Sequence, residues 1–278
     1  VTQAADDNYE SATATMTLTV SQADIATATV ASISGQTYTG NAITVSPTVT
    51  FNSSTLTETT DYTLSYSDNT NAGTASLTLS GTGNFTGSKT LSFTIVKADP
   101  VITFNDITKS FIDPDFNLTA TSSSTGAFTY SIADTDVATV SGNTVSIVGA
   151  GTTTVTVSQA ADSNYNTATA TMTLTVGKIN PTLSGFNALV KTYGDPDFEL
   201  STPIKNSDNT GAFSYSSSDS NIISLSGTTA TILKAGVVTI TANLAADNNY
   251  NTASITTTII VNKKDQSITV GALPTSQP

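Results

Sequence analysis

Residues 157–176 read VSQAADSNYNTATATMTLTV, and this stretch decides the fold because copies of it recur along the chain. Residues 1–20 read VTQAADDNYESATATMTLTV, residues 242–261 read ANLAADNNYNTASITTTIIV, and a divergent version at residues 79–96 reads LSGTGNFTGSKTLSFTIV. The second half of each copy alternates apolar and polar residues, which is typical of a strand that buries one face. Each repeated unit therefore ends in an amphipathic β-strand.

An aromatic residue preceded by Asn marks the same place in each copy. These residues are Tyr9, Phe85, Tyr165 and Tyr250, at intervals of 76, 80 and 85 residues. Such an interval is the length of one β-sandwich domain and is too long for a leucine-rich, ankyrin or propeller-blade repeat. We therefore expect each repeat to be a domain. We expect these aromatic residues at core or corner positions, like the tyrosine that pins the edge of a sandwich.

A second pair of matching segments supports this frame. Residues 111–151 begin with FIDPDF and residues 193–236 begin with YGDPDF, and both continue through Gly-Ala-Phe and end in Ala-Gly. Within a repeat, runs of Gly, Asn, Asp and Ser separate about seven short stretches of alternating apolar and polar residues. The sequence therefore predicts an all-β fold of tandem immunoglobulin-like β-sandwich domains, each built from two antiparallel sheets.

The repeats set the expected domain limits. Short linkers, VKADP, VGKINP and VNKKDQ, join neighbouring repeats. Linkers this short leave little freedom, so we expect an elongated, semi-rigid rod with further repeats on both sides. The expected segments are the C-terminal strands of an incomplete repeat at 1–20, a repeat of divergent subtype at 21–97, repeats at 98–177 and 178–263, and the first strand of another incomplete repeat at 264–278.

Charge and residue types exclude several functions. Charged residues make up 11% of the chain, against about 25% in ordinary globular domains, and the net charge is −12. All nine basic residues are Lys, which argues against a basic patch for nucleic acid. Without Cys or His the usual nucleophilic triads cannot be built, so we expect no enzyme and no catalytic or cofactor site. No apolar run of about 18 residues occurs, so we expect no membrane span in this segment.

Acidic turns are the candidate metal ligands. Their residues are Asp113 with Asp115, Asp195 with Asp197, Asp6 with Asp7 and Asn8, and Asp162 with Asn164. Asp and Asn side chains commonly bond the backbone of their own turn, so we predict a structural role for all of them. Hard oxygen ligands also suit Ca²⁺, which remains the alternative, although no stretch has the spacing of an EF-hand loop.

Aromatic and lysine side chains could serve two further roles. A sugar-binding platform would use aromatic residues, but these recur in pairs at equivalent repeat positions and are predicted to be core: Phe116 and Phe198, Phe128 and Phe213, Tyr130 and Tyr215. Intramolecular isopeptide bonds would use lysines within strands. The lysines lie at linkers or before turns, so we predict solvated side chains for Lys97, Lys109, Lys178, Lys191, Lys263 and Lys264.

The motifs carry a family resemblance over essentially the whole chain. The Asp-Pro-Asp-Phe openings, the Gly-Ala-Phe-x-Tyr-Ser centres and the Ala-Ala-Asp-x-Asn-Tyr-Asn endings resemble bacterial Ig-like repeats of giant surface proteins in Bacteroidota. Residues 21–97 lack the Asp-Pro-Asp opening, and their YTGNAIT and DYTLSYSDNTNAGTASLTLSGTGNFTG segments are similar to a related bacterial surface repeat.

This resemblance implies a role and a location. It implies a stalk segment of a secreted or cell-surface adhesin, associated with the outer membrane, exported by type IX secretion and serving attachment or gliding motility. The expected partners are further repeats of the same chain and a surface or glycan ligand bound outside this segment. The alternative is a carbohydrate-binding Ig-like module of a surface polysaccharide-utilisation protein, because repeats of this kind serve in many proteins.

Overall fold

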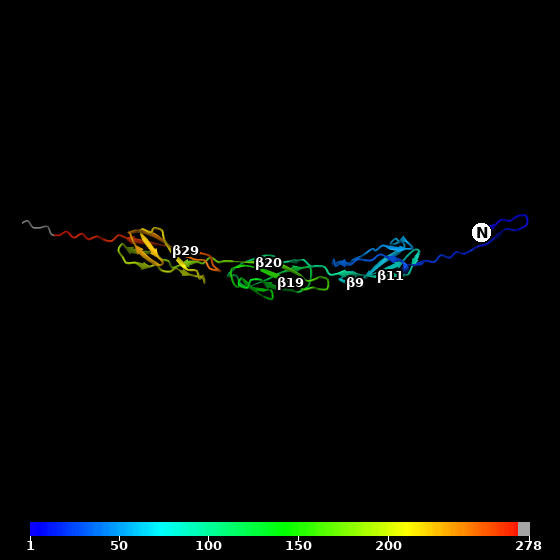
Figure 1. The fold of residues 1–278 in the computed structure, drawn as a ribbon, viewed down its shortest axis with the longest axis horizontal. Helices are drawn as coiled ribbons and strands as arrows, with labels where there is room; N and C mark the ends of the chain where they lie inside the picture. Colours follow the sequence, from blue (N-terminus) through cyan, green and yellow to red (C-terminus); the bar gives the residue numbers. More distant parts are fainter. Residues whose placement is uncertain (272–278) are drawn as a thin grey trace, which may run out of the picture. The chain divides into compact units, whose positions relative to one another are not determined.

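The computed structural model describes residues 1–271, which form β-strands and one short 3-10 helix, η1 (Ile25–Thr27) (Figure 1). Within these residues no helix is long and apolar enough to cross a membrane. The chain divides into two compact units. Unit 1 holds Val1–Ile102, Ser122–Phe128 and Ser158–Thr169, whereas unit 2 holds Thr103–Thr121, Thr129–Val157 and the chain from Ala170 onward. We call residues 21–97, 98–177 and 178–263 repeats 1, 2 and 3; their limits as independent domains stay a prediction.

Repeat 1 lies in unit 1 and forms two main sheets. One is ordered β5-β11-β9-β8 and the other β4-β6-β7, and a short parallel pair, β3 with β10, lies beside them. The strands are β3 (Ala23–Asp24), β4 (Thr29–Val30), β5 (Gln36–Thr37), β6 (Val49–Phe51), β7 (Ser54–Thr55), β8 (Tyr62–Ser67), β9 (Gly73–Gly81), β10 (Phe85–Thr86) and β11 (Ser88–Val96).

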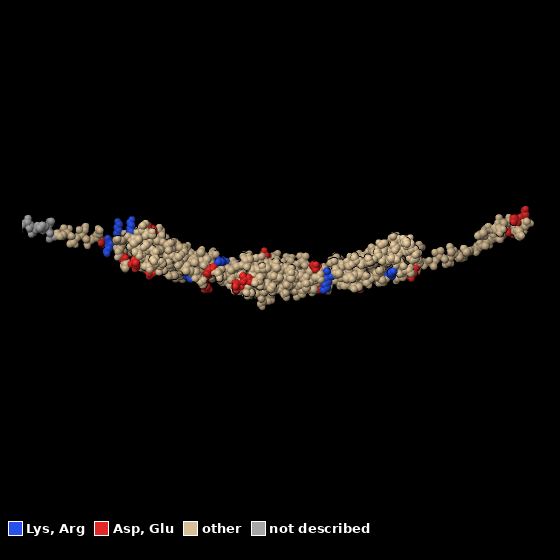
Figure 2. Space-filling model, in the orientation of Figure 1, with Lys and Arg blue, Asp and Glu red and all other residues tan. Residues whose placement is uncertain are grey.

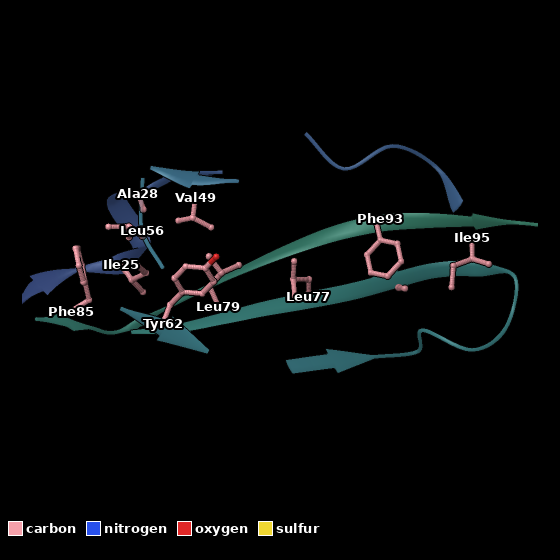
Figure 3. Close-up of a cluster of buried hydrophobic side chains, with 11 residues drawn as sticks. Ile25, Ala28, Val49, Leu56, Tyr62, Leu77, Leu79, Phe85, Phe93 and Ile95 are labelled. Carbon is pink, nitrogen blue, oxygen red and sulfur yellow. The ribbon is translucent and has the colours of Figure 1, made fainter. Parts of the chain in front are cut away.

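The core of repeat 1 fills the space between these sheets. Along β9, Ala75, Leu77 and Leu79 are buried while the residues between them are not, so the period of two is realised as one buried face. Figure 3 shows Leu77, Leu79 and Phe93 on one side of the cluster facing Val49 and Ala28 on the other.

Repeat 2 supplies strands to both units. Its main sheets are ordered β13-β20-β19-β16 and β14-β18-β17, and its core cluster includes Leu118, Val145, Val155 and Leu174 in unit 2. The strands are β12 (Ile102–Thr103), β13 (Ile107–Ser110), β14 (Phe116–Asn117), β15 (Thr121–Ser122), β16 (Phe128–Ile132), β17 (Ala138–Ser141), β18 (Thr144–Ile147), β19 (Gly151–Gln159) and β20 (Ala168–Gly177).

Repeat 3 lies in unit 2 and has the same strand order as repeat 2. Its sheets are β22-β29-β28-β25 and β23-β27-β26, with a short β21–β24 pair, around a core that includes Ile223, Ile240 and Ile259. The strands are β21 (Leu183–Ser184), β22 (Leu189–Thr192), β23 (Phe198–Glu199), β24 (Ile204–Lys205), β25 (Phe213–Ser217), β26 (Ile223–Ser226), β27 (Thr229–Ile232), β28 (Gly236–Leu244) and β29 (Ala253–Asn262).

The predicted all-β fold of tandem β-sandwiches is confirmed, with one correction to strand direction. In each repeat an early strand pairs parallel with the last strand: β5 with β11, β13 with β20, and β22 with β29. The four-stranded sheets are therefore mixed rather than purely antiparallel. Because the early and last strands run in the same direction, the chain enters a repeat at one end and leaves at the other.

The two terminal segments lack most of their expected strands. Residues 1–20 form only the short antiparallel pair β1 (Thr2–Gln3) and β2 (Ala12–Thr13), and Met16, Leu18 and Val20 are 79–90% exposed. The equivalent of β20 does not form there because no opposite sheet covers its apolar face. Residues 264–271 contain no strand, and the rest of the strand expected at 264–278 lies outside the described residues.

Candidate functional site

The Asp-x-Asn-Tyr sequence folds into the same turn in three places. Asp162 Oδ1 accepts hydrogen bonds of 2.8 Å from the backbone N–H groups of Asn164 and Tyr165, and the Asp162 N–H donates to the Tyr165 carbonyl. Residues 247–250 and residues 6–9 repeat this pattern at 2.8–2.9 Å. The aspartate thus fixes the turn, which we call the Asp-x-Asn-Tyr turn.

The other carboxylate oxygen ties the turn to the loop before Gly-Ala-Phe. Asp162 Oδ2 accepts from the Ser124 hydroxyl at 2.9 Å and from the Thr125 N–H and hydroxyl at 2.8 and 3.0 Å. In repeat 3, Asp247 Oδ2 accepts from the Thr210 N–H at 2.7 Å and from its hydroxyl at 3.2 Å. Backbone hydrogen bonds, first those from Thr125 and Thr210, hold the pKa of Asp162 and of Asp247 below the usual range for aspartate.

These bonds favour the structural role over the Ca²⁺ alternative at Asp162. Both of its carboxylate oxygens face N–H and O–H donors, which leaves poor access for a cation.

At the Asp-Pro-Asp openings, Asp113 and Asp195 each accept a hydrogen bond from a backbone N–H three residues earlier, at 3.0 and 2.8 Å, while Asp115 and Asp197 are exposed. Among residues 1–271 no group of three His, Cys, Asp or Glu side chains is placed to hold a metal. Ca²⁺ binding itself stays untested.

A pH dependence follows from the depressed pKa of Asp162. The folded-state pKa lies below the unfolded value of about 3.9, so the carboxylate stabilises the fold above that pH, and this contribution is lost as the pH falls toward the folded-state pKa. We expect the melting temperature to fall between pH 5 and pH 2, and Asp162→Asn to lower it at pH 7 and to flatten this dependence. Thermal unfolding followed by circular dichroism checks this. An equal flattening in the exposed-site control Asp115→Asn would contradict it.

The linkers before repeats 2 and 3 are each hydrogen-bonded to the Asp-x-Asn-Tyr turn of the repeat that follows. The Ala98 N–H donates to the Asn164 carbonyl at 3.0 Å and the Asn166 N–H donates to the Ala98 carbonyl at 2.9 Å, and Ile179 makes the equivalent bonds of 3.0 and 2.8 Å in repeat 3. Lys97 Nζ donates to the Asp162 carbonyl at 2.6 Å. Two turns of the chain therefore hold their linkers by the same hydrogen bonds.

Lys97 and Lys178 are exposed and Lys109 and Lys191 are partly exposed, but each of the four also makes a specific contact. Lys178 Nζ donates to the Asp247 carbonyl at 2.7 Å, as Lys97 does in repeat 2. Lys109 and Lys191 lie over the rings of Phe116 and Phe198, with Nζ 4.8 and 4.4 Å from the ring centroids. Lys263 and Lys264 are exposed, as predicted.

In unit 1 the turn of repeat 2 contacts repeat 1. The Tyr165 ring meets the Tyr38 ring edge to face, with centroids 5.3 Å apart. Asn164 Oδ1 accepts from the Ala72 N–H at 2.9 Å, and Asn164 Nδ2 donates to Asn71 Oδ1 at 3.1 Å. The Asn and Tyr of the turn thus bind a neighbouring repeat, while its Asp holds the turn together.

In unit 2 the turn of repeat 3 makes the same contacts with repeat 2. The Tyr250 ring meets the Phe111 ring edge to face at 5.9 Å, and Asn249 Oδ1 accepts from the Ala150 N–H at 2.8 Å.

The residues that receive the turn are also equivalent from one repeat to the next. Tyr38, Phe111 and Tyr193 each donate a backbone N–H to the end of the last strand of their repeat, and Ala72, Ala150 and Ala235 each precede the glycine that begins β9, β19 or β28. We call Tyr38 with Ala72, Phe111 with Ala150, and Tyr193 with Ala235 the receiving pairs.

The four aligned aromatic residues therefore have different surroundings. Phe85 is buried in the core of repeat 1, edge to face with Phe51 at 5.3 Å, whereas Tyr165 and Tyr250 contact the preceding repeat. Tyr9 is 72% exposed. The alignment alone did not separate these cases. The Asp three residues before Tyr9, Tyr165 and Tyr250 distinguishes these turn tyrosines from Phe85, which has Thr82 in that place.

The other paired aromatic positions lie in or beside the cores. Tyr130 packs near Phe104 with centroids 5.9 Å apart, and Tyr215 packs near Phe186 at 6.1 Å. Phe116, Phe128, Phe198 and Phe213 are partly buried. Figure 2 shows few charged side chains on a largely neutral surface, in keeping with the composition.

Comparison with known proteins gives only distant likenesses. No protein-family model and no curated protein matches the chain. A Drosophila N-cadherin EC1-4 structure is 12% identical with a TM-score of 0.29, over 68% of this chain and 57% of that one. Human protocadherin-24 EC1-2 is 14% identical with a TM-score of 0.28, over 62% of this chain and 100% of that one. A SusE-like polysaccharide-binding surface protein of Bacteroides thetaiotaomicron is 14% identical with a TM-score of 0.24, over 62% and 36%. These likenesses are too distant to assign a family or a function.

Proposed function

We propose that this chain is a structural stalk segment of a large secreted or cell-surface repeat adhesin, which spaces a distal binding region from the cell. The observation that carries the proposal is the repeated joint. Tyr165 and Asn164 bind one receiving pair in unit 1, and Tyr250 and Asn249 bind the equivalent pair in unit 2. Across residues 1–271 the joint recurs, while no group of three His, Cys, Asp or Glu side chains is placed to hold a metal. This combination suits a spacer.

The strand directions and the linkers support the same role. The chain enters each repeat at one end and leaves it at the other, so every added repeat lengthens the segment. The linkers are held by the lysine and backbone hydrogen bonds of the turn, which limits bending at the joint. A semi-rigid rod is the arrangement that such joints favour.

The class of adhesin rests on the sequence resemblance. The Asp-Pro-Asp-Phe and Ala-Ala-Asp-x-Asn-Tyr motifs support a giant surface protein of Bacteroidota, exported by type IX secretion and serving attachment or gliding motility. The proposal includes a place at the outer membrane and no enzymatic activity, the latter because His and Cys are missing.

Pulling single molecules tests the stalk role. We expect serial unfolding of the three repeats, each releasing about 28 nm of chain, since roughly 80 residues extend at about 3.5 Å each. A single cooperative event would contradict it. Binding of the chain itself to a glycan array would instead favour the carbohydrate-binding alternative.

The joint itself has a measurable energy. We expect a double-mutant cycle of Phe111→Ala and Tyr250→Ala to give a coupling of about 1 kcal/mol in the stability of unit 2, because an edge-to-face aromatic pair contributes about that much beyond its buried area. Urea unfolding of the four proteins measures it. A cycle of Phe111→Ala with the distant, exposed Val237→Ala is the control and should show no coupling.

A further inference from the structure

Repeat 3 carries a row of exposed apolar side chains on the outer face of its four-stranded sheet. Val190 on β22 and Val237 on β28 are both register partners of Ile260, which lies between them on β29. Val190 is 64% exposed, Val237 63% and Ile260 41%. Exposed apolar residues are ordinary when they are scattered, but these three lie side by side on adjacent strands and form one patch. We call Val190, Ile260 and Val237 the apolar row.

The other two repeats have threonine in this place. The residues of repeat 2 that are equivalent to the apolar row are Thr108, Thr175 and Thr152, and Thr108 is the register partner of Thr175. In repeat 1 the matching pair is Thr94 with Thr74. Threonine, valine and isoleucine are all favoured in strands, so pairing within the sheet does not require the change. The apolar row therefore distinguishes repeat 3 by its surface rather than by its fold.

The apolar row lies outside the contacts that join one repeat to the next. In unit 2 the turn of repeat 3 fills the receiving pair of repeat 2, and Thr108 and Thr152 of repeat 2 nevertheless stay exposed. A repeat that docks in this way thus leaves the equivalent row in solvent. The apolar row is therefore accessible to a partner that approaches the outer face of the sheet.

The face around the apolar row carries no charge. Besides the row, the outward positions of β22, β25, β28 and β29 hold only Thr, Ser and Asn. The one charged residue within these strands, Lys191, lies on the inner side over the Phe198 ring. Two chains that each have a net charge of −12 repel each other. An uncharged face lets two copies meet at the least electrostatic cost, and it offers no charge for a charged partner to recognise.

We propose that the apolar row binds the same row of a second copy of this chain, so that the outer faces of two four-stranded sheets pack together. Such a contact is isologous, since the same patch lies on both sides of a twofold axis. The apolar side chains fill its middle, and the surrounding hydroxyl and amide groups form a polar rim, as in ordinary interfaces. The inference goes beyond the proposed function, because it adds association between two chains to the spacing role of each.

The size of the face makes this contact a weak one. The two central strands, β28 and β29, are nine and ten residues long. Four strands about 4.8 Å apart, at about 3.3 Å per residue, thus cover at most roughly 19 by 30 Å. Complete overlap would bury roughly 1,100 Å² over both copies, which is below the roughly 1,200–2,000 Å² of stable complexes and typical of transient ones. We therefore expect a dissociation constant on the order of 0.1–1 mM.

Sedimentation equilibrium of the full chain at concentrations up to about 1 mM tests the contact. We expect the weight-average mass to rise above the monomer value with concentration. It should rise further in high salt, because salt screens the repulsion between the acidic chains. Giving repeat 3 the threonines of repeat 2, by Val190→Thr, Ile260→Thr and Val237→Thr together, should weaken the association at least tenfold. Circular dichroism should show that this triple variant keeps its fold.

Two further variants separate the apolar row from general stickiness and from misfolding. Ile204→Thr removes an apolar side chain of repeat 3 that is 63% exposed but lies on β24, outside the four-stranded sheet, so association should be unchanged. In the triple variant, Thr108→Val, Thr175→Ile and Thr152→Val rebuild the row on repeat 2. These substitutions should restore the association.

A chain that stays monomeric at about 1 mM, or an association that survives in the triple variant, would overturn the proposal. A neutral polysaccharide such as dextran is the other occupant to be tested. If it shifted the amide signals of the apolar row in a chain that stays monomeric, it would also overturn the second copy as the partner and would favour the carbohydrate-binding alternative. None of these results bears on the serial unfolding of single chains, so the stalk role is tested separately.

Discussion

Replacing Gly211 by Ala is expected to lower the free energy of unfolding of repeat 3 by about 3 kcal/mol, the upper range for overpacking a tight site. A Cβ at this position would lie 2.0 Å from the Ala245 carbonyl oxygen and 2.7 Å from its carbon. The two backbones are held this close because the Ala245 N–H donates to the Ala212 carbonyl at 3.0 Å and Asp247 accepts from Thr210. The added methyl group can be accommodated only by breaking these bonds.

Urea unfolding of the full chain measures the loss, with Gly177→Ala as the matched control. A Cβ at Gly177 would meet its nearest atom, the Lys109 carbonyl oxygen, at 3.6 Å, which is an ordinary contact. That variant should change stability by less than about 0.5 kcal/mol. If Gly211→Ala were equally mild, the close approach of the Gly-Ala-Phe loop to the strand end would not be a constraint on the fold.

This glycine illustrates how far the sequence alone reaches. The recurrence of Gly-Ala-Phe at Gly126 and Gly211 identified equivalent positions, and the alternation that includes Met172, Leu174 and Val176 predicted which face is buried. The match between aligned repeats and the alternation of period two are both present in the sequence itself, so they can be recognised without coordinates. The glycine is needed because the Ala245 carbonyl oxygen, just beyond the end of β28 and more than thirty residues along the chain, lies against it. This approach depends on strand pairing that no local pattern specifies.

The joint could be predicted only in part for the same reason. Asp162 was recognised as a turn residue, since an aspartate that bonds its own backbone is a local feature. Asn164 accepts a hydrogen bond from the Ala72 N–H, over ninety residues away. This contact depends on how a linker and a turn place two repeats together. The parallel pairing of early and last strands was missed because alternation fixes which face is buried but not the direction of the neighbouring strand.

Replacing Leu77 by Ala is expected to lower the free energy of unfolding of repeat 1 by about 3 kcal/mol and to leave repeats 2 and 3 nearly unchanged. Leu77 is fully buried among Val49, Phe93 and the other side chains of its cluster (Figure 3). The substitution therefore leaves a cavity that strands β9 and β11 cannot close. The cores of repeats 2 and 3 share no residue with this cluster. The loss should therefore stay within one repeat.

Pulling single molecules distinguishes this result from a shared transition. In Leu77→Ala one of the three unfolding events should move to lower force, and Ile240→Ala, which empties the core of repeat 3, should weaken a different event. Val96→Ala on β11 is the control, because that side chain is 48% exposed and its loss should leave every event in place. If Leu77→Ala weakened all events together, the repeats would not be independent domains. The chain would then resist force as one cooperative body, and its length under load would change in a single step rather than repeat by repeat.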